Sequence, residues 1–125
     1  MISINKQLTR LYHEDIIWYI YFFIIFFYLY SNHLEELYIQ NKDIKLKKKF
    51  RKINKIVFFI VLIIYIYFLI VNIDKVQELD NNSTYSQRKI TYLSLIISIL
   101  FVIAGVISLY LSFESETLDN EIAFI

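Results

Sequence analysis

The stretch IVFFIVLIIYIYFLIV, residues 56–71, contains no charged residue, and the uncharged run continues to residue 73. A helix rises about 1.5 Å per residue, so a run of this length crosses the roughly 30 Å hydrocarbon core of a bilayer. The run does not alternate between apolar and polar residues, as a strand of a membrane barrel would. We therefore expect a transmembrane helix, which satisfies its own backbone hydrogen bonds within lipid.

Two further uncharged runs lie at residues 16–34 and 90–113, and the charged residues gather in the segments between the runs. A soluble helical domain would carry charge along the outer face of every helix. The sequence therefore predicts an all-α polytopic membrane protein, a single membrane domain over residues 1–125. Its three transmembrane helices are expected near residues 12–32, 52–73 and 89–113, with a basic loop at 35–52 and an acidic tail at 114–125.

The first segment between the runs is strongly basic, which sets the expected topology. Lys and Arg near the ends of membrane helices favour the inner side of a membrane. We therefore expect loop 35–52 and tail 114–125 inside, and the N-terminus and second loop outside. In a mitochondrion these sides are the matrix and the intermembrane space. The basic residues of the loop are Lys45, Lys47, Lys48, Lys49, Arg51 and Lys52.

The basic segment also has an apolar face, since Leu46, Phe50, Ile53 and Val57 recur at helical spacing. This predicts that the second helix begins near Asp43 and lies partly at the lipid headgroups. We expect its bases to bind anionic lipids such as cardiolipin, and not nucleic acid, because topology and lipid binding already explain the charges. The acidic tail is expected in the same compartment as the basic loop. Three alternatives are open for it: contact with the basic loop, contact with a partner subunit, or exposure to solvent.

One face of the third helix carries small residues. Small residues allow helices to approach closely in membranes, and hydroxyls can hydrogen-bond across the interface. The alternative is that each serine bonds only its own i−4 carbonyl. The shared face favours a packing seam, and its predicted members are Ser94, Ser98, Gly105, Ser108 and Ser112.

The residues that support catalysis or cofactor binding are scarce. The chain has no Cys and no Pro, a single Gly, and no Asp, Glu, Lys or Arg within the three uncharged runs. Proton and ion paths require ionisable groups at membrane depth. His13 and His33 flank opposite ends of the first run, too far apart to share a metal. We therefore predict no catalytic, cofactor-binding or metal-binding residues and no enzyme activity.

The abundance of Phe, Tyr, Ile, Lys and Asn indicates an AT-rich coding sequence and resembles the hydrophobic proteins encoded in ciliate mitochondrial DNA. The layout, including the basic segment KLKKKFRK, is similar to the smallest three-helix subunit of respiratory complex I. That family carries a glutamate within its second helix, and IVFFIVLIIYIYFLIVNI has none. The resemblance therefore implies a structural or accessory subunit of a mitochondrial respiratory complex, with other membrane subunits as partners. The alternative is a phage holin-like or other small bacterial membrane protein, pore-forming or conferring immunity.

Overall fold

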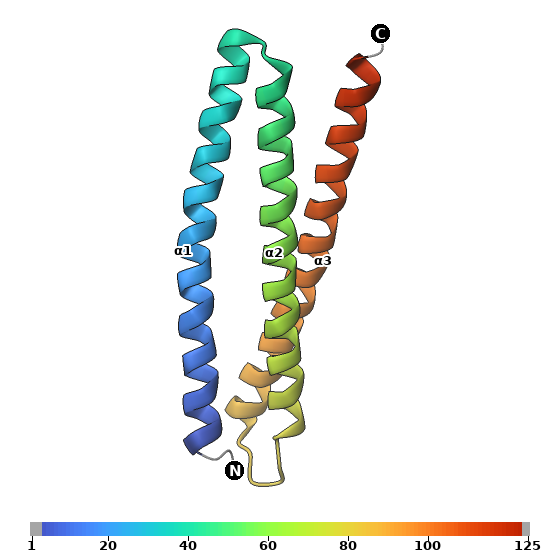
Figure 1. Cartoon of the computed structure of the whole chain (residues 1–125). Helices are drawn as coiled ribbons and strands as arrows, with labels where there is room; N and C mark the ends of the chain where they lie inside the picture. The colour runs from blue at the N-terminus through green and yellow to red at the C-terminus, as the bar shows by residue number, and fades with distance from the viewer. Residues whose placement is uncertain (1–3, 124–125) are drawn as a thin grey trace.

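The computed structural model describes residues 4–123, with side chains described through residue 115, and this part of the chain forms three long helices (Figure 1). They are α1 (Ile4–Asn41), α2 (Ile44–Gln77) and α3 (Tyr85–Ala123). Each contains a stretch long and apolar enough to cross a membrane. The expected all-α fold with three membrane-crossing helices is confirmed.

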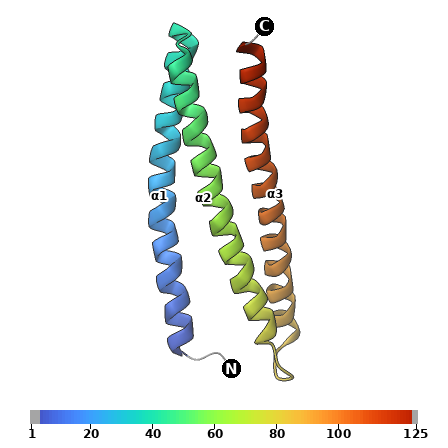
Figure 2. The ribbon, with the colours of Figure 1, turned by 45° about the vertical axis from the view of Figure 1, so that its right-hand side comes forward.

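The helices run up, down and up, with α2 at the centre. Both α1 and α3 pack on α2, whereas no backbone contact joins α1 to α3 within the described residues. The α1–α2 turn and the end of α3 lie at one end of the molecule, and the α2–α3 turn lies at the other (Figure 1). Figure 2 shows that α3 diverges from α2 toward its C-terminal end. The result is an open arrangement and not a closed bundle.

The helices are longer than the expected spans, with 38, 34 and 39 residues. At about 1.5 Å per residue each exceeds 50 Å, well beyond a hydrocarbon core of about 30 Å. The segment 35–52 is accordingly helical except for Lys42 and Asp43, and is not a loop. Its Glu, Leu and Lys residues favour helix, and no Pro or Gly interrupts it, so α1 and α2 continue beyond the membrane.

The turn between α1 and α2 consists of two residues. Lys42 adopts a left-handed conformation with φ of 58°, and its N–H donates to the Tyr38 carbonyl at 2.7 Å. This is the helix-ending motif that glycine usually supplies. Asp43 then caps α2, because its carboxylate accepts from the backbone N–H of Lys45 at 3.0 Å. The observed start of α2 agrees with the start expected near Asp43.

The turn between α2 and α3 is held by polar side chains. The Asp80 carboxylate accepts from the backbone N–H of Asn82 at 2.9 Å, which forms a local turn. Thr84 and Gln87 then form a capping box, in which each side chain accepts from the backbone N–H of the other at 3.1 and 2.8 Å. Both turns therefore form without glycine or proline.

Few side chains are buried between the helices. The buried apolar residues are Ile17, Leu34, Phe50, Val57 and Ile64. The outer face of α2 is as apolar as its inner faces, since it exposes Ile56, Phe59, Ile63, Ile66, Ile70 and Ile73. A helix without a polar outer face is stable in lipid and not in water. These are the properties of an integral membrane protein.

Candidate functional site

The contact between α1 and α2 follows a seven-residue repeat. Phe50, Val57 and Ile64, the buried residues of α2, are seven residues apart, and Ile17 and Ser31 on α1 are fourteen apart. A seven-residue apolar repeat keeps one seam facing its partner and is typical of helices that pack with a left-handed supercoil. The first two helices therefore form an antiparallel hairpin with a coiled-coil-like seam.

A polar contact lies within this seam. The side chain of Ser31 is fully buried, and its hydroxyl donates to the Asn54 side-chain oxygen at 2.6 Å. It also lies 3.4 Å from the carbonyl oxygen of Phe50. Hydrogen bonds between membrane helices contribute about 0.6 kcal/mol on average, so this contact selects the register of the hairpin more than it stabilises it.

The opposite end of the hairpin is joined by ion pairs. Arg10 donates from Nη2 to the carboxylates of Asp74 and Glu78, at 2.8 Å in each case, and from Nη1 to the second Glu78 oxygen at 3.2 Å. Lys6 Nζ lies 3.1 Å from Asp74 and 2.5 Å from Glu78. Two bases and two acids from residues more than sixty positions apart therefore form one network.

The network changes the acidity of its carboxylates. Hydrogen bonds from Lys6 and Arg10 lower the pKa of Asp74 below its usual value. Burial alone would raise the pKa of Glu78, but the hydrogen bonds from the same two bases outweigh it, so this pKa also lies below its usual value. Both acids therefore stay ionised at neutral pH and hold the first turn of α1 against the last turn of α2.

The predicted face of small residues on α3 lies toward α2. Ser98 is 4% exposed, Gly105 is buried, and Ser94, Ser108 and Ser112 are half-buried. A Cβ placed on Gly105 would lie 3.1 Å from Leu62 Cδ1 and 3.1 Å from Tyr65 Cδ2. The absence of a side chain at Gly105 thus permits the close approach of α2 and α3. Together with Phe101, which lies between Ser98 and Gly105, these five residues recur at alternating steps of four and three positions.

Asn72 of α2 supplies a polar contact on the same seam. Its amide nitrogen donates to the hydroxyl of Ser98 and lies 3.4 Å from the Ser94 carbonyl. The Ser98 hydroxyl in turn donates to the same carbonyl at 3.0 Å. Ser98 therefore makes both of the hydrogen bonds considered for the serines: one to its own i−4 carbonyl and one across the interface. Tyr65 and Phe101 stack nearby with ring centroids 5.2 Å apart.

The basic residues of 45–52 lie on the first turns of α2, beside the end of α1. The ammonium groups of Lys47 and Lys49 lie over the rings of Tyr38 and Tyr30, 5.3 and 5.5 Å from the ring centroids. Their binding to anionic lipid stays a prediction. The side chains of Lys45, Lys48, Lys49 and Lys52 are exposed, and those of Lys47 and Arg51 are half-buried.

The end of α3 lies on the same side as this basic segment (Figure 1). Lys55 Nζ lies 5.2 Å from the Phe113 ring centroid, so the long side chain of Lys55 bridges α2 and α3 there although the helices diverge. Of the four acids in the tail, Glu114 is exposed, and the side chains of Glu116, Asp119 and Glu121 lie outside the described residues. The contact of the tail with the basic segment or with a partner stays a prediction, beside the alternative of a solvated tail.

The two histidines are far apart. The ring of His13 lies 6.1 Å from that of Tyr67, near one end of the helices, and His33 is exposed near the other. Among the described side chains, no group of three or more His, Asp or Glu residues is arranged to hold a metal ion.

Asn54, Asn72 and the ion-pair network were not predicted from the sequence. A signal was present for each amide, since a lone Asn within or next to an apolar helix requires a partner that lipid cannot supply. No pattern within one helix predicts the ion pairs between the start of α1 and the end of α2. They form because the short turn at residues 42–43 makes the two helices antiparallel, and because the helices have similar lengths.

Comparison with known proteins adds no family to this description. The chain matches no protein-family model, and neither a curated protein nor a solved structure is significantly similar to it.

Proposed function

We propose that this chain is a non-catalytic structural subunit of a larger membrane complex, in a mitochondrial inner membrane and within a respiratory-chain assembly. The mitochondrial part of the proposal rests on the composition and layout described above. The part that concerns a complex rests on the outer surface of α1.

The supporting observation is an aromatic surface that the chain does not use in its own packing. Phe22 and Phe26 are 59% and 61% exposed, and they lie one above the other on α1. The rings of Phe22 and Phe26 are 5.5 Å apart in an edge-to-face arrangement. Aromatic pairs contribute about 0.5–1.5 kcal/mol beyond their buried area. This surface therefore suits contact with neighbouring subunits without any polar bond.

The proposed orientation places the N-terminus and the α2–α3 turn in the intermembrane space and the C-terminus in the matrix. The distribution of bases supports it, because eight Lys and Arg residues lie at 42–55 and five lie at the opposite end of the helices. An excess of Lys and Arg favours the inner side.

The test of complex membership is purification of the native protein in a mild detergent, followed by native electrophoresis and mass spectrometry of its partners. We expect migration with a large assembly that contains respiratory subunits. The double variant Phe22→Ala, Phe26→Ala should migrate as a smaller species. Phe59→Ala, which removes an exposed ring from the outer face of α2, is the control and should stay with the assembly. A stable monomer, or a pore formed by the isolated chain in liposomes, would overturn the proposal and favour the holin-like alternative.

The orientation is tested separately. The chain has no Cys, so a single cysteine at Lys48 reports the side of the membrane on which the α1–α2 turn lies. We expect this cysteine to be labelled only when the reagent has entered the inner compartment. Labelling by an impermeant reagent from outside would show that the orientation is the opposite of the proposed one.

A further inference from the structure

An open groove runs between α1 and α3 with α2 as its floor. Its volume is about 720 Å³, within the usual range for small-molecule sites. The groove exists because α1 and α3 both pack on α2 and do not close on each other within the described residues. Most of its lining is aromatic or aliphatic, and includes Trp18, Tyr21, Tyr65, Phe68, Ile97 and Phe101.

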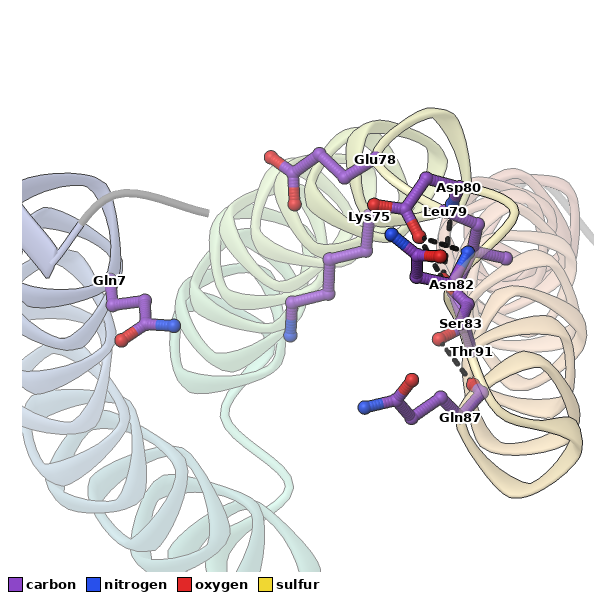
Figure 3. A pocket seen from close by; sticks show the side chains of 9 residues that line it. All are labelled: Gln7, Lys75, Glu78, Leu79, Asp80, Asn82, Ser83, Gln87 and Thr91. Atoms are coloured by element: carbon purple, nitrogen blue, oxygen red, sulfur yellow. Dashed lines mark hydrogen bonds between the residues drawn. The ribbon is translucent and has the colours of Figure 1, made fainter. Parts of the chain in front are cut away.

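A second, polar pocket adjoins this groove at the end of the molecule that carries the α2–α3 turn. It has a volume of about 460 Å³ and is lined by polar and charged side chains from all three helices and the turn. Lys75 lines both spaces, so the apolar groove and the polar pocket lie next to each other at this residue. Figure 3 shows Lys75 extending from α2 toward the space between Gln7 of α1 and Gln87 of α3.

The charges at this junction have both signs. Lys75 contributes a base, and Glu14 of α1 contributes a carboxylate to the same groove. The carboxylate of Glu78 lines the polar pocket but is engaged by Lys6 and Arg10. An anionic headgroup in the groove would therefore meet a single lysine, in a lining that also carries the Glu14 carboxylate. A headgroup with a phosphate and an adjacent ammonium would match both charges.

From this arrangement we propose that the groove binds one zwitterionic phospholipid with a primary amine, of the phosphatidylethanolamine class. The phosphate pairs with Lys75, the ammonium donates hydrogen bonds toward Glu14 and the polar pocket, and one acyl chain lies along the aromatic groove. A choline headgroup carries the same charges but has no N–H donors. The basic segment at the other end of the helices is the predicted site for anionic lipid, so the two ends select different headgroups.

A lipid fits the groove better than a helix of another subunit does. The groove is open along its length and would face acyl chains in a bilayer, and its lining includes one acid and one base, Glu14 and Lys75, that flank the uncharged runs. The proposal concerns this chain alone and does not depend on membership of a complex.

The first test is native mass spectrometry of the full chain in mild detergent with equal amounts of phosphatidylethanolamine, phosphatidylcholine and phosphatidylglycerol. We expect stronger retention of one phosphatidylethanolamine than of phosphatidylcholine, which carries the same charges. Lys75→Gln should weaken retention of phosphatidylethanolamine roughly two- to fivefold, as expected for a partly exposed ion pair, and Lys89→Gln, an exposed base outside both spaces, should not. Phosphatidylglycerol held at the basic segment should be insensitive to Lys75→Gln. Equal retention of phosphatidylethanolamine and phosphatidylcholine, or no change in Lys75→Gln, would overturn the proposal.

The second test identifies the occupant in the membrane. Ile97 lines the groove and is 51% exposed, whereas the neighbouring Ile96 is 52% exposed and does not line it. A single cysteine at either position can carry a photoactivatable crosslinker in native membranes. We expect an adduct of phosphatidylethanolamine mass from position 97, in excess over position 96. A polypeptide adduct specific to position 97 would assign the groove to a neighbouring helix, and equal lipid adducts at both positions would indicate bulk lipid; either result overturns the proposal.

Discussion

Replacement of Gly105 by leucine should separate α2 from α3. A Cβ at this position already lies 3.1 Å from Leu62 and Tyr65, so the remaining carbons of leucine have no space between the two side chains. Overpacking of this kind costs about 1–3 kcal/mol. Separation of the helices would also weaken the Tyr65–Phe101 stack, which contributes about 0.5–1.5 kcal/mol. The gain in helix propensity over glycine offsets roughly 0.8 kcal/mol, which leaves a net loss of about 2 kcal/mol.

The assay follows the distance between α2 and α3 while a mixed micelle is titrated with a denaturing detergent. Because the chain has no Cys, a donor and an acceptor dye can be attached at cysteines replacing Ile66 and Leu100, both exposed. Gly105→Leu should shift the transition to a lower denaturant fraction. Gly105→Ala should stay close to the parent protein, because a lone methyl group gains helix propensity while the two neighbours need to move by only a few tenths of an ångström.

The matched control is Ala104→Leu, which adds a leucine at an exposed position one residue away. It should leave the transition unchanged because its side chain points into lipid. Equal sensitivity of positions 104 and 105, or tolerance of leucine at both, would refute the close approach of α2 and α3 at Gly105.

Three further predictions concern the α1–α2 hairpin and use the same titration with dyes on these two helices. Acidification should leave the stability of the hairpin unchanged down to about pH 5 and lower it below about pH 4. The reason is that Asp74 and Glu78 have lowered pKa values and lose their contribution as the pH falls through these values. Arg10→Gln should flatten this response, and an unaltered pH profile in that variant would contradict the network. Lys42→Gly should stabilise the hairpin by about 0.5–1 kcal/mol, since it relieves a left-handed conformation at φ of 58°, whereas destabilisation would count against that turn. Ser31→Ala should cost about 0.6 kcal/mol by leaving the side-chain oxygen of Asn54 unpaired, and a neutral result would show that this bond does not contribute.

The sequence by itself determined the fold class, and it shows which face of α3 carries the small residues. Both are local properties: the uncharged run at 56–73 is long enough to cross a bilayer, and the periodicity of Ser94, Ser98 and Gly105 follows from the geometry of one helix. The start of α2 near Asp43 was predictable for the same reason, since a cap and an apolar face lie within a few residues of each other.

The tertiary structure alone decided which helices pair and what lies between them. The network of Arg10 with Glu78 joins residues 68 positions apart, and the bond from Asn72 to Ser98 joins residues 26 apart. These contacts depend on the register that the two turns impose, which no pattern within a single helix specifies. The groove between α1 and α3 arises because α2 presents two separate seams and its neighbours do not meet, so it is a property of three helices together and not of any one of them.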